Sequence, residues 1–154
     1  MAYFEWAGDM EIDQGPIDED HRKLVQQVND LHTATTDGRG TEVVAKLLAE
    51  LLDDTAAHIH REEVYMHTLG YPELERHKQG HVRFMDQLRA LQAKYDAGSV
   101  TVASQLSSVL RDWLSLHIRR HDKAIVAFLR ERQRKETRAA LAQKRLSVAP
   151  KRPS

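Results

Sequence analysis

The fold of this chain is decided by residues 58–81, which read HIHREEVYMHTLGYPELERHKQGH. The stretch holds His58 and Glu62, four residues apart, and then His77 and His81, again four apart. On an α-helix, side chains at positions i and i+4 lie one above the other on the same face. If both segments are helical, each pair therefore presents two metal-binding side chains together.

The two pairs are separated by Leu69-Gly70-Tyr71-Pro72. Glycine is favoured just after the end of a helix and proline in the first turn of the next, so these residues predict a tight turn between two helices. The turn would fold the second pair back against the first, which brings three imidazoles and one carboxylate into a shared space. Such donors suit iron, zinc, copper or nickel better than calcium or magnesium.

Length and composition limit the class of protein. A chain of 154 residues with 41% apolar and 30% charged residues fits one soluble globular domain. The sequence has no cysteine, so disulfides and thiolate ligands are excluded and any metal must be held by nitrogen and oxygen. The N-terminus lacks the pattern of a signal peptide, and no apolar run is long enough to span a bilayer. We therefore expect a cytoplasmic protein.

The net charge of zero hides an uneven distribution. Residues 130–154 carry nine Lys/Arg and two Glu, a net charge of +7, and the rest carries 14 basic and 21 acidic residues, a net charge of −7. Nucleic-acid binding needs a basic surface, so the acidic body argues against that function. Only the basic tail could serve an anionic partner, such as a membrane surface.

The apolar pattern predicts an all-α fold, an antiparallel four-helix bundle with an N-terminal arm and a basic C-terminal extension. We expect helices over about residues 18–37, 41–69 and 72–96 and from about residue 101 onward, with residues 1–16 as an ordered arm. Residues 1–130 would form the domain and residues 131–154 the tail. Within the tail, residues 131–146 could extend the last helix, and residues 149–154 are expected to be disordered.

Each predicted helix carries histidine on, or beside, its core-facing stripe. A single such histidine is more often a hydrogen-bonded core or surface residue than a ligand. Five buried imidazoles without a metal, however, would leave many polar nitrogens in need of partners. The set that predicts a joint metal site is His21, His58, His77, His81 and His117.

The last helix leaves two possibilities open. His117 could pair with His121 at i+4, which ideal helical geometry favours, or with Asp122 at i+5. Because i+5 is rotated well off the face, Asp122 would need a local π-bulge, and such bulges often lie at functional sites. Spacing alone does not choose between the two residues.

The combined pattern resembles the hemerythrin family, specifically its single-domain bacterial members, over about residues 4–130. The resemblance implies a site with two non-haem iron ions (Fe2+/Fe3+), an oxo or hydroxo bridge between them, and dioxygen as the ligand. It further implies that Glu62 and Asp122 bridge the irons, and that Asp122 rather than His121 is a ligand. The residues that carry the resemblance are His21, His58-x-x-x-Glu62, His77-x-x-x-His81 and His117-x-x-x-x-Asp122, with the flanks Ile17–Asp20, Glu62-Glu63, Tyr71-Pro72 and Trp113–Ile118.

By the same resemblance, His77, His81 and His117 hold one iron, and His21 and His58 hold the other, which keeps an open position for dioxygen. The expected function is reversible dioxygen binding for storage, transport or delivery to an oxygen-using enzyme, without catalysis. The alternative is an oxygen or redox sensor, or an adaptor that docks to a signalling protein through its basic tail. An apolar, dry oxygen pocket is expected from Ile59, Trp113, Leu114, Ile118 and Ile125.

Overall fold

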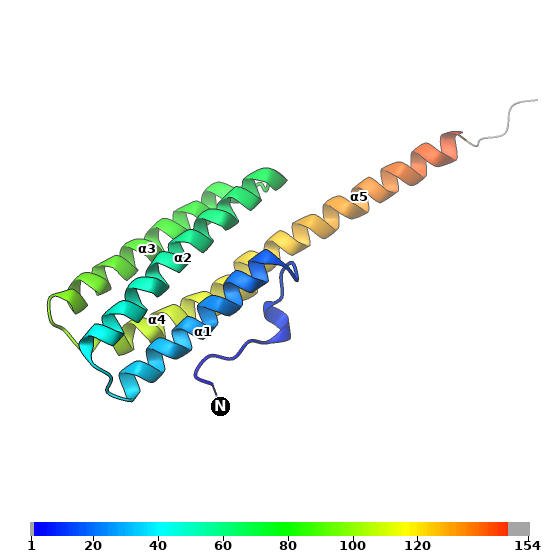
Figure 1. The fold of residues 1–154 in the computed structure, drawn as a ribbon. Helices are drawn as coiled ribbons and strands as arrows, with labels where there is room; N and C mark the ends of the chain where they lie inside the picture. Colours follow the sequence, from blue (N-terminus) through cyan, green and yellow to red (C-terminus); the bar gives the residue numbers. More distant parts are fainter. Residues whose placement is uncertain (1, 148–154) are drawn as a thin grey trace, which may run out of the picture.

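A computed structural model describes residues 2–147, in which four antiparallel helices form a bundle. α1 packs against α2 and α4, and α3 packs against the same two helices, so the four surround one core (Figure 1). No helix in this described range is long and apolar enough to cross a membrane. The elements are η1 (Gly8–Met10), α1 (Pro16–Thr36), α2 (Thr41–Leu69), α3 (Leu74–Asp96), α4 (Val102–Leu116), η2 (His117–Asp122) and α5 (Lys123–Ser147).

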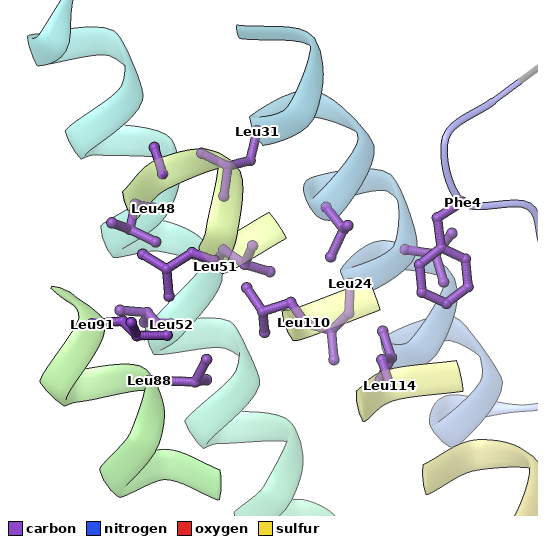
Figure 2. Packing of buried hydrophobic residues seen from close by; sticks show 14 of the residues in the cluster. Phe4, Leu24, Leu31, Leu48, Leu51, Leu52, Leu88, Leu91, Leu110 and Leu114 are labelled. Atoms are coloured by element: carbon purple, nitrogen blue, oxygen red, sulfur yellow. The ribbon is translucent and has the colours of Figure 1, made fainter. Parts of the chain in front are cut away.

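The core is built mostly from leucines that recur at helical spacing. Leu48, Leu51 and Leu52 of α2 face Leu88 and Leu91 of α3 (Figure 2). All five are less than 10% exposed, and α1 and α4 complete the cluster. Burying a leucine side chain stabilises a fold by roughly 1.5–3 kcal/mol, so this half of the bundle is a rigid support for the other.

The N-terminal arm is fixed by two carboxylates. Asp13 accepts hydrogen bonds from the backbone N–H groups of Ile17 and Asp18, both at 3.1 Å, which satisfies free donors in the first turn of α1. The buried carboxylate of Asp18 in turn accepts bonds from the backbone of Ile12 at 2.8 Å and Gln14 at 2.9 Å. Together with Pro16 at the first helical position, these bonds start α1 two residues earlier than the expected Asp18.

The turn between α2 and α3 agrees with the sequence pattern. Gly70 has a φ of 67°, and the N–H groups of Gly70 and Tyr71 donate to the carbonyls of His67 and Met66, both at 3.0 Å. This left-handed cap favours glycine because a side chain there would be strained. Pro72 lies in the turn itself, so α3 begins at Leu74 rather than near Pro72.

α4, η2 and α5 follow one another without a break from Val102 to Ser147. The middle segment η2 is a π-helix, in which each turn is wider than in the α-helices on either side. Beyond Arg130 every described residue of α5 is exposed, and this part of the helix projects past the bundle (Figure 1). The helix thus extends through the predicted segment 131–146, whereas residues 149–154 lie outside the described residues.

Candidate metal centre

Seven polar side chains meet inside the bundle. α1 contributes His21, α2 contributes His58 and Glu62, α3 contributes His77 and His81, and η2 contributes His117 and Asp122. Each is 7% exposed or less, and His21 and Asp122 are fully buried. Buried imidazoles and carboxylates at this density need partners, so their convergence is a strong indication of bound cations.

The π-helix brings Asp122 to the same side as His117. In an α-helix a residue five positions on is rotated by about 140° from the first. The wider turn of η2 removes most of that rotation, and Asp122 Oδ1 lies 3.0 Å from His117 Nε2. His121 is exposed and belongs to neither cluster of potential ligands. Of the two possibilities that spacing left open, the geometry favours Asp122.

The seven side chains divide into two clusters. His77, His81 and His117 share the first, where their Nε2 atoms lie 3.4, 3.5 and 3.1 Å from Glu62 Oε1. His21 and His58 share the second, and their Nε2 atoms are only 2.9 Å apart. One cluster therefore offers three nitrogens and the other offers two.

Each carboxylate faces both clusters. Glu62 directs Oε1 toward the three-histidine cluster and Oε2 toward His58, at 3.1 Å. Asp122 directs Oδ1 toward His117 and Oδ2 toward His21, at 3.2 Å. This division of oxygens is the arrangement in which a carboxylate joins two neighbouring cations, one to each oxygen.

The buried atoms of the site fit a metal better than they fit one another. Within residues 2–147, the buried atoms Glu62 Oε2 and Asp122 Oδ2 have no hydrogen-bond partner, although imidazole nitrogens lie 3.1–3.2 Å away. Buried carboxylate oxygens without a hydrogen-bond donor are suited to a cation. An all-nitrogen-and-oxygen set of this kind suits first-row transition metals, iron included.

Two further carboxylates hold the outer edges of the imidazoles. Asp20 Oδ2 lies 3.3 Å from His58 Nδ1 and is itself bonded by Arg61 at 2.8 Å. Glu63 Oε1 lies 3.0 Å from His81 Nδ1. Carboxylates in this position fix the orientation of a metal-binding imidazole and make it a stronger donor.

Opposite charges compensate one another in the metal-free site. Burial disfavours the protonated imidazole of His21, but contacts with Asp122 and Glu62 outweigh it and raise its pKa to about 9. Burial likewise opposes protonation of His117, whose pKa rises to about 10 through attraction to Asp122 and Glu62. Burial opposes ionisation of Glu62 and Asp122, yet the surrounding imidazoles hold both pKa values below their ordinary values. Metal binding must therefore displace protons from the histidines.

The five apolar residues expected around an oxygen pocket do not all lie together. Ile59, Leu114 and Ile118 belong to the main core, and all are 7% exposed or less. Trp113 stacks between Phe84 and His117, with ring centroids 3.7 and 4.3 Å away, on the three-histidine side. Ile125 packs in a separate small cluster with Met66 and Tyr71. The role of these residues as an oxygen pocket remains a prediction.

The other histidines lie outside both clusters. His60, His67 and His121 are exposed, and His32 stacks on Tyr3 of the arm with ring centroids 3.6 Å apart. The sequence pattern named Asp20 only as part of the flank Ile17–Asp20 and did not predict its contact with His58. The available signal was its position directly before His21, but no spacing rule connects Asp20 with a histidine on another helix.

A four-helix bundle with two buried His/carboxylate clusters defines a cation-binding helical domain, consistent with a site for two metals. Comparison with known families agrees, because the family described as "Hemerythrin HHE cation binding domain" matches residues 15–129. The chain belongs to the hemerythrin family.

Named relatives support this membership. The chain is 32% identical over 124 residues to a bacteriohemerythrin of Stenotrophomonas maltophilia, which covers 80% of each chain. It is also 32% identical over 124 residues to a bacteriohemerythrin of Methylococcus capsulatus, covering 80% of this chain and 94% of the relative. A crystal structure of a hemerythrin leucine-to-alanine mutant matches with a TM-score of 0.74 at 29% identity, covering 82% of this chain and 97% of that one.

Proposed function

We propose that this protein binds dioxygen reversibly at a pair of non-haem iron ions, for storage, transport or delivery to oxygen-using enzymes. His77, His81 and His117 would hold one iron, His21 and His58 the other, and Glu62 and Asp122 would bridge them. Iron bound there would supply the reversible exchange of electrons with dioxygen. Family membership and the names of the relatives support iron and dioxygen for this chain.

One observation carries the proposal. Both carboxylates divide their oxygens between the clusters, so each metal would receive two oxygens, but one receives three nitrogens and the other two. The two metal positions are therefore unequal by one donor. The position beside His21 and His58 would therefore keep a free coordination position for an exogenous ligand, which supports binding of a small molecule rather than a purely structural role.

The surrounding side chains would keep that position dry and fixed. Leu114 is 2% exposed and points toward α1, the helix that carries His21, and Ile118 is fully buried, so both side chains would help to exclude water there. Water and protons promote the loss of reduced oxygen species, and their exclusion favours release of intact dioxygen. Asp20 holds His58 in orientation from outside the cluster at 3.3 Å.

The test is a visible spectrum of iron-loaded, anaerobically reduced protein, recorded before oxygen, after oxygen, and after purging with argon. We expect a colour that appears with oxygen and bleaches on purging. A one-way change to a stable ferric spectrum would contradict reversible binding. Steady turnover of peroxide or nitric oxide by the purified protein would instead favour an enzyme.

A second candidate function is an oxygen or redox sensor, or an adaptor. The observation that favours it is the projecting part of α5, residues 131–147, which is exposed throughout and carries six Lys/Arg and two Glu. Isolated helices of this length are marginal in water, so a binding partner would stabilise it. Deleting residues 131–154 separates the two functions, because unchanged oxygen affinity with lost partner capture would favour the adaptor.

A further inference from the structure

A hollow of about 460 Å³ lies on the surface beside the three-histidine cluster, between α3 and the segment that joins α4 to α5. His77 and His117 form part of its wall, together with the indole of Trp113. The imidazoles of His77 and His117 thus border the hollow and also belong to the three-histidine cluster. We call it the arginine hollow, after Arg76, Arg83 and Arg120 in its wall.

The charges around the arginine hollow are unbalanced. Its three arginines are exposed, and none forms a salt bridge within residues 2–147, whereas Arg61, Arg119 and Arg132 elsewhere do. Glu73 is the one carboxylate in the wall. His121 also borders the hollow, and burial together with the nearby positive charges of His117 and His77 lowers its pKa. The hollow thus has three exposed guanidinium groups against one carboxylate, an excess of positive charge.

The inner wall offers hydrogen-bond donors as well as charge. The Nε2 atoms of His77 and His117 point into the metal centre, within 3.4 Å of carboxylate oxygens. Their Nδ1 atoms have no hydrogen-bond partner among the described residues, unlike those of His58 and His81, which face Asp20 and Glu63. Of the five imidazoles within 4 Å of a Glu62 oxygen, His58 and His81 have an outer carboxylate, whereas His21, His77 and His117 have none among the described residues.

We propose that the arginine hollow binds a small oxyanion, a phosphate or a carboxylate. Its oxygens would pair with the guanidinium groups and accept hydrogen bonds from the Nδ1–H groups of His77 and His117. Guanidinium groups match the planar fork of such anions, and charge-assisted bonds of this kind are strong. The anion would accept hydrogen bonds from the Nδ1 atoms of these two imidazoles, as Asp20 and Glu63 do from those of His58 and His81.

Binding of the anion would influence the metal centre. An acceptor on the outer nitrogen makes an imidazole a stronger donor to its metal, which favours the more highly charged oxidised state. This consequence rests on the proposed function, because it requires His77 and His117 to be iron ligands. Anion binding itself does not require dioxygen binding, so either can fail without the other.

The test is calorimetric titration of iron-loaded, oxidised protein with inorganic phosphate at constant ionic strength, with acetate as the carboxylate probe and chloride as the control. We expect one saturable site for phosphate or acetate and none for chloride. Arg76→Gln and Arg120→Gln should each weaken binding roughly tenfold, the loss expected for one charge-assisted bond. The matched control is Arg39→Gln, which removes the same charge from the connection between α1 and α2, at the other end of the bundle from the α2–α3 turn (Figure 1).

Three results would overturn the proposal. The first is no saturable binding of either anion. The second is equal weakening by Arg39→Gln, which would mean that only overall charge matters. The third is binding that both hollow variants leave unchanged, because the anion would then occupy the metal centre itself. The visible spectrum of the iron, recorded in the same titration, should shift with saturation if the anion contacts His77 and His117.

Discussion

At the scale of single residues, the site depends on how two carboxylates are shared. Glu62 and Asp122 each turn one oxygen to either cluster, so neither cluster is complete without both residues. The seven candidate ligands were all named from sequence, and the structure brings all seven together. Their assignment to two irons stays a proposal. The contact of Asp20 with His58 and the arginine hollow were not foreseen, because they depend on which helices become neighbours.

Leu114 offers a test of the dry pocket. Its side chain is 2% exposed and points into the bundle toward α1 (Figure 2). We expect Leu114→Ala to speed autoxidation of the oxygen-bound protein, because the space left by the leucine lets water approach. Such a truncation also costs about 2–5 kcal/mol of stability, so a matched control is needed.

The control is Leu110→Ala, one helical turn further from His117 and equally buried. Both variants should unfold more easily, but only Leu114→Ala should autoxidise faster, as followed by the decay of the oxygen-bound absorption. Equal autoxidation rates in the two variants would show that general loosening, and not the pocket, is responsible.

The titrating groups of the metal-free site predict how its stability depends on pH. The pKa values of His21 and His117 are raised to about 9 and about 10. Their contribution to the free energy of unfolding is therefore full below the ordinary histidine pKa of 6.5 and is lost as the pH rises to 9–10. The pKa values of Glu62 and Asp122 are lowered from their ordinary values of 4.5 and 3.8. The stability that these two carboxylates contribute is therefore present above those pH values and is lost as the pH falls further. Denaturant unfolding of the metal-free protein should therefore show greatest stability near pH 5–6.5.

On the alkaline side, His21→Gln should flatten the decline, since one of the three histidines with a raised pKa, His21, His77 and His117, is then absent. A denaturation midpoint that does not change between pH 6.5 and 10 would contradict the attraction assigned to these imidazoles. Metal-loaded protein should show a weaker alkaline decline, because bound metal replaces the protons.

At the scale of the helices, the local sequence pattern predicted most helix boundaries. It failed where contacts with another element determine the start or the geometry of a helix. α2 runs from Thr41 to Leu69, as expected, because the glycines of the connection before it and the Gly70 cap after it are local signals. The start of α1 was misplaced because the cap comes from Asp13, outside the apolar pattern. Whether η2 would be a π-helix depends on what Asp122 meets across the bundle, which spacing along one helix does not contain.

Because η2 is a π-helix, we expect substitutions of the neighbouring residues His121 and Asp122 to have opposite effects on metal binding. We expect His121→Gln to keep two metal ions per chain, because His121 is exposed and outside both clusters. Asp122→Asn should lose at least one, because a carboxylate that faces both clusters is removed. Metal analysis after dialysis gives the stoichiometry, and circular dichroism verifies that both variants fold. Loss of metal from the His121 variant would mean that the helix adopts ordinary α geometry in solution.

At the scale of the whole molecule, five imidazoles and two carboxylates occupy an interior that a purely apolar bundle would fill with leucine. Metal binding should therefore support the fold, because a ligand that binds only the folded state stabilises it. We expect removal of iron by a chelator to lower the melting temperature by roughly 5–10 °C, as for a ligand at about a hundredfold above its Kd. The chelator should lower the melting temperature of the Glu62→Gln variant very little. An equal decrease in the unsubstituted protein and in this variant would contradict the prediction.

The overall architecture was predictable from sequence because four amphipathic segments with short connections have few ways to bury their apolar faces. The three-dimensional position of the tail was not, since residues 131–147 are exposed throughout and their one hydrogen bond to another described element, from Arg132 to the Leu69 carbonyl, leaves no pattern in the sequence. The uneven charge was visible in the sequence, but the separation of basic helix from acidic body appears only once α5 projects past the bundle (Figure 1).

The continuous helix from Val102 to Ser147 has a mechanical consequence. Its π turn carries two candidate ligands, His117 and Asp122, and leads into α5, whose first turns pack on the bundle through Ile125. Residues 131–147 then project for roughly 24 Å beyond the packed part. An arm of that length acts as a lever. A rotation of α5 by about 5° about its packed base would move its tip by roughly 2 Å. A change at the buried centre that turned η2 would therefore displace the end of α5.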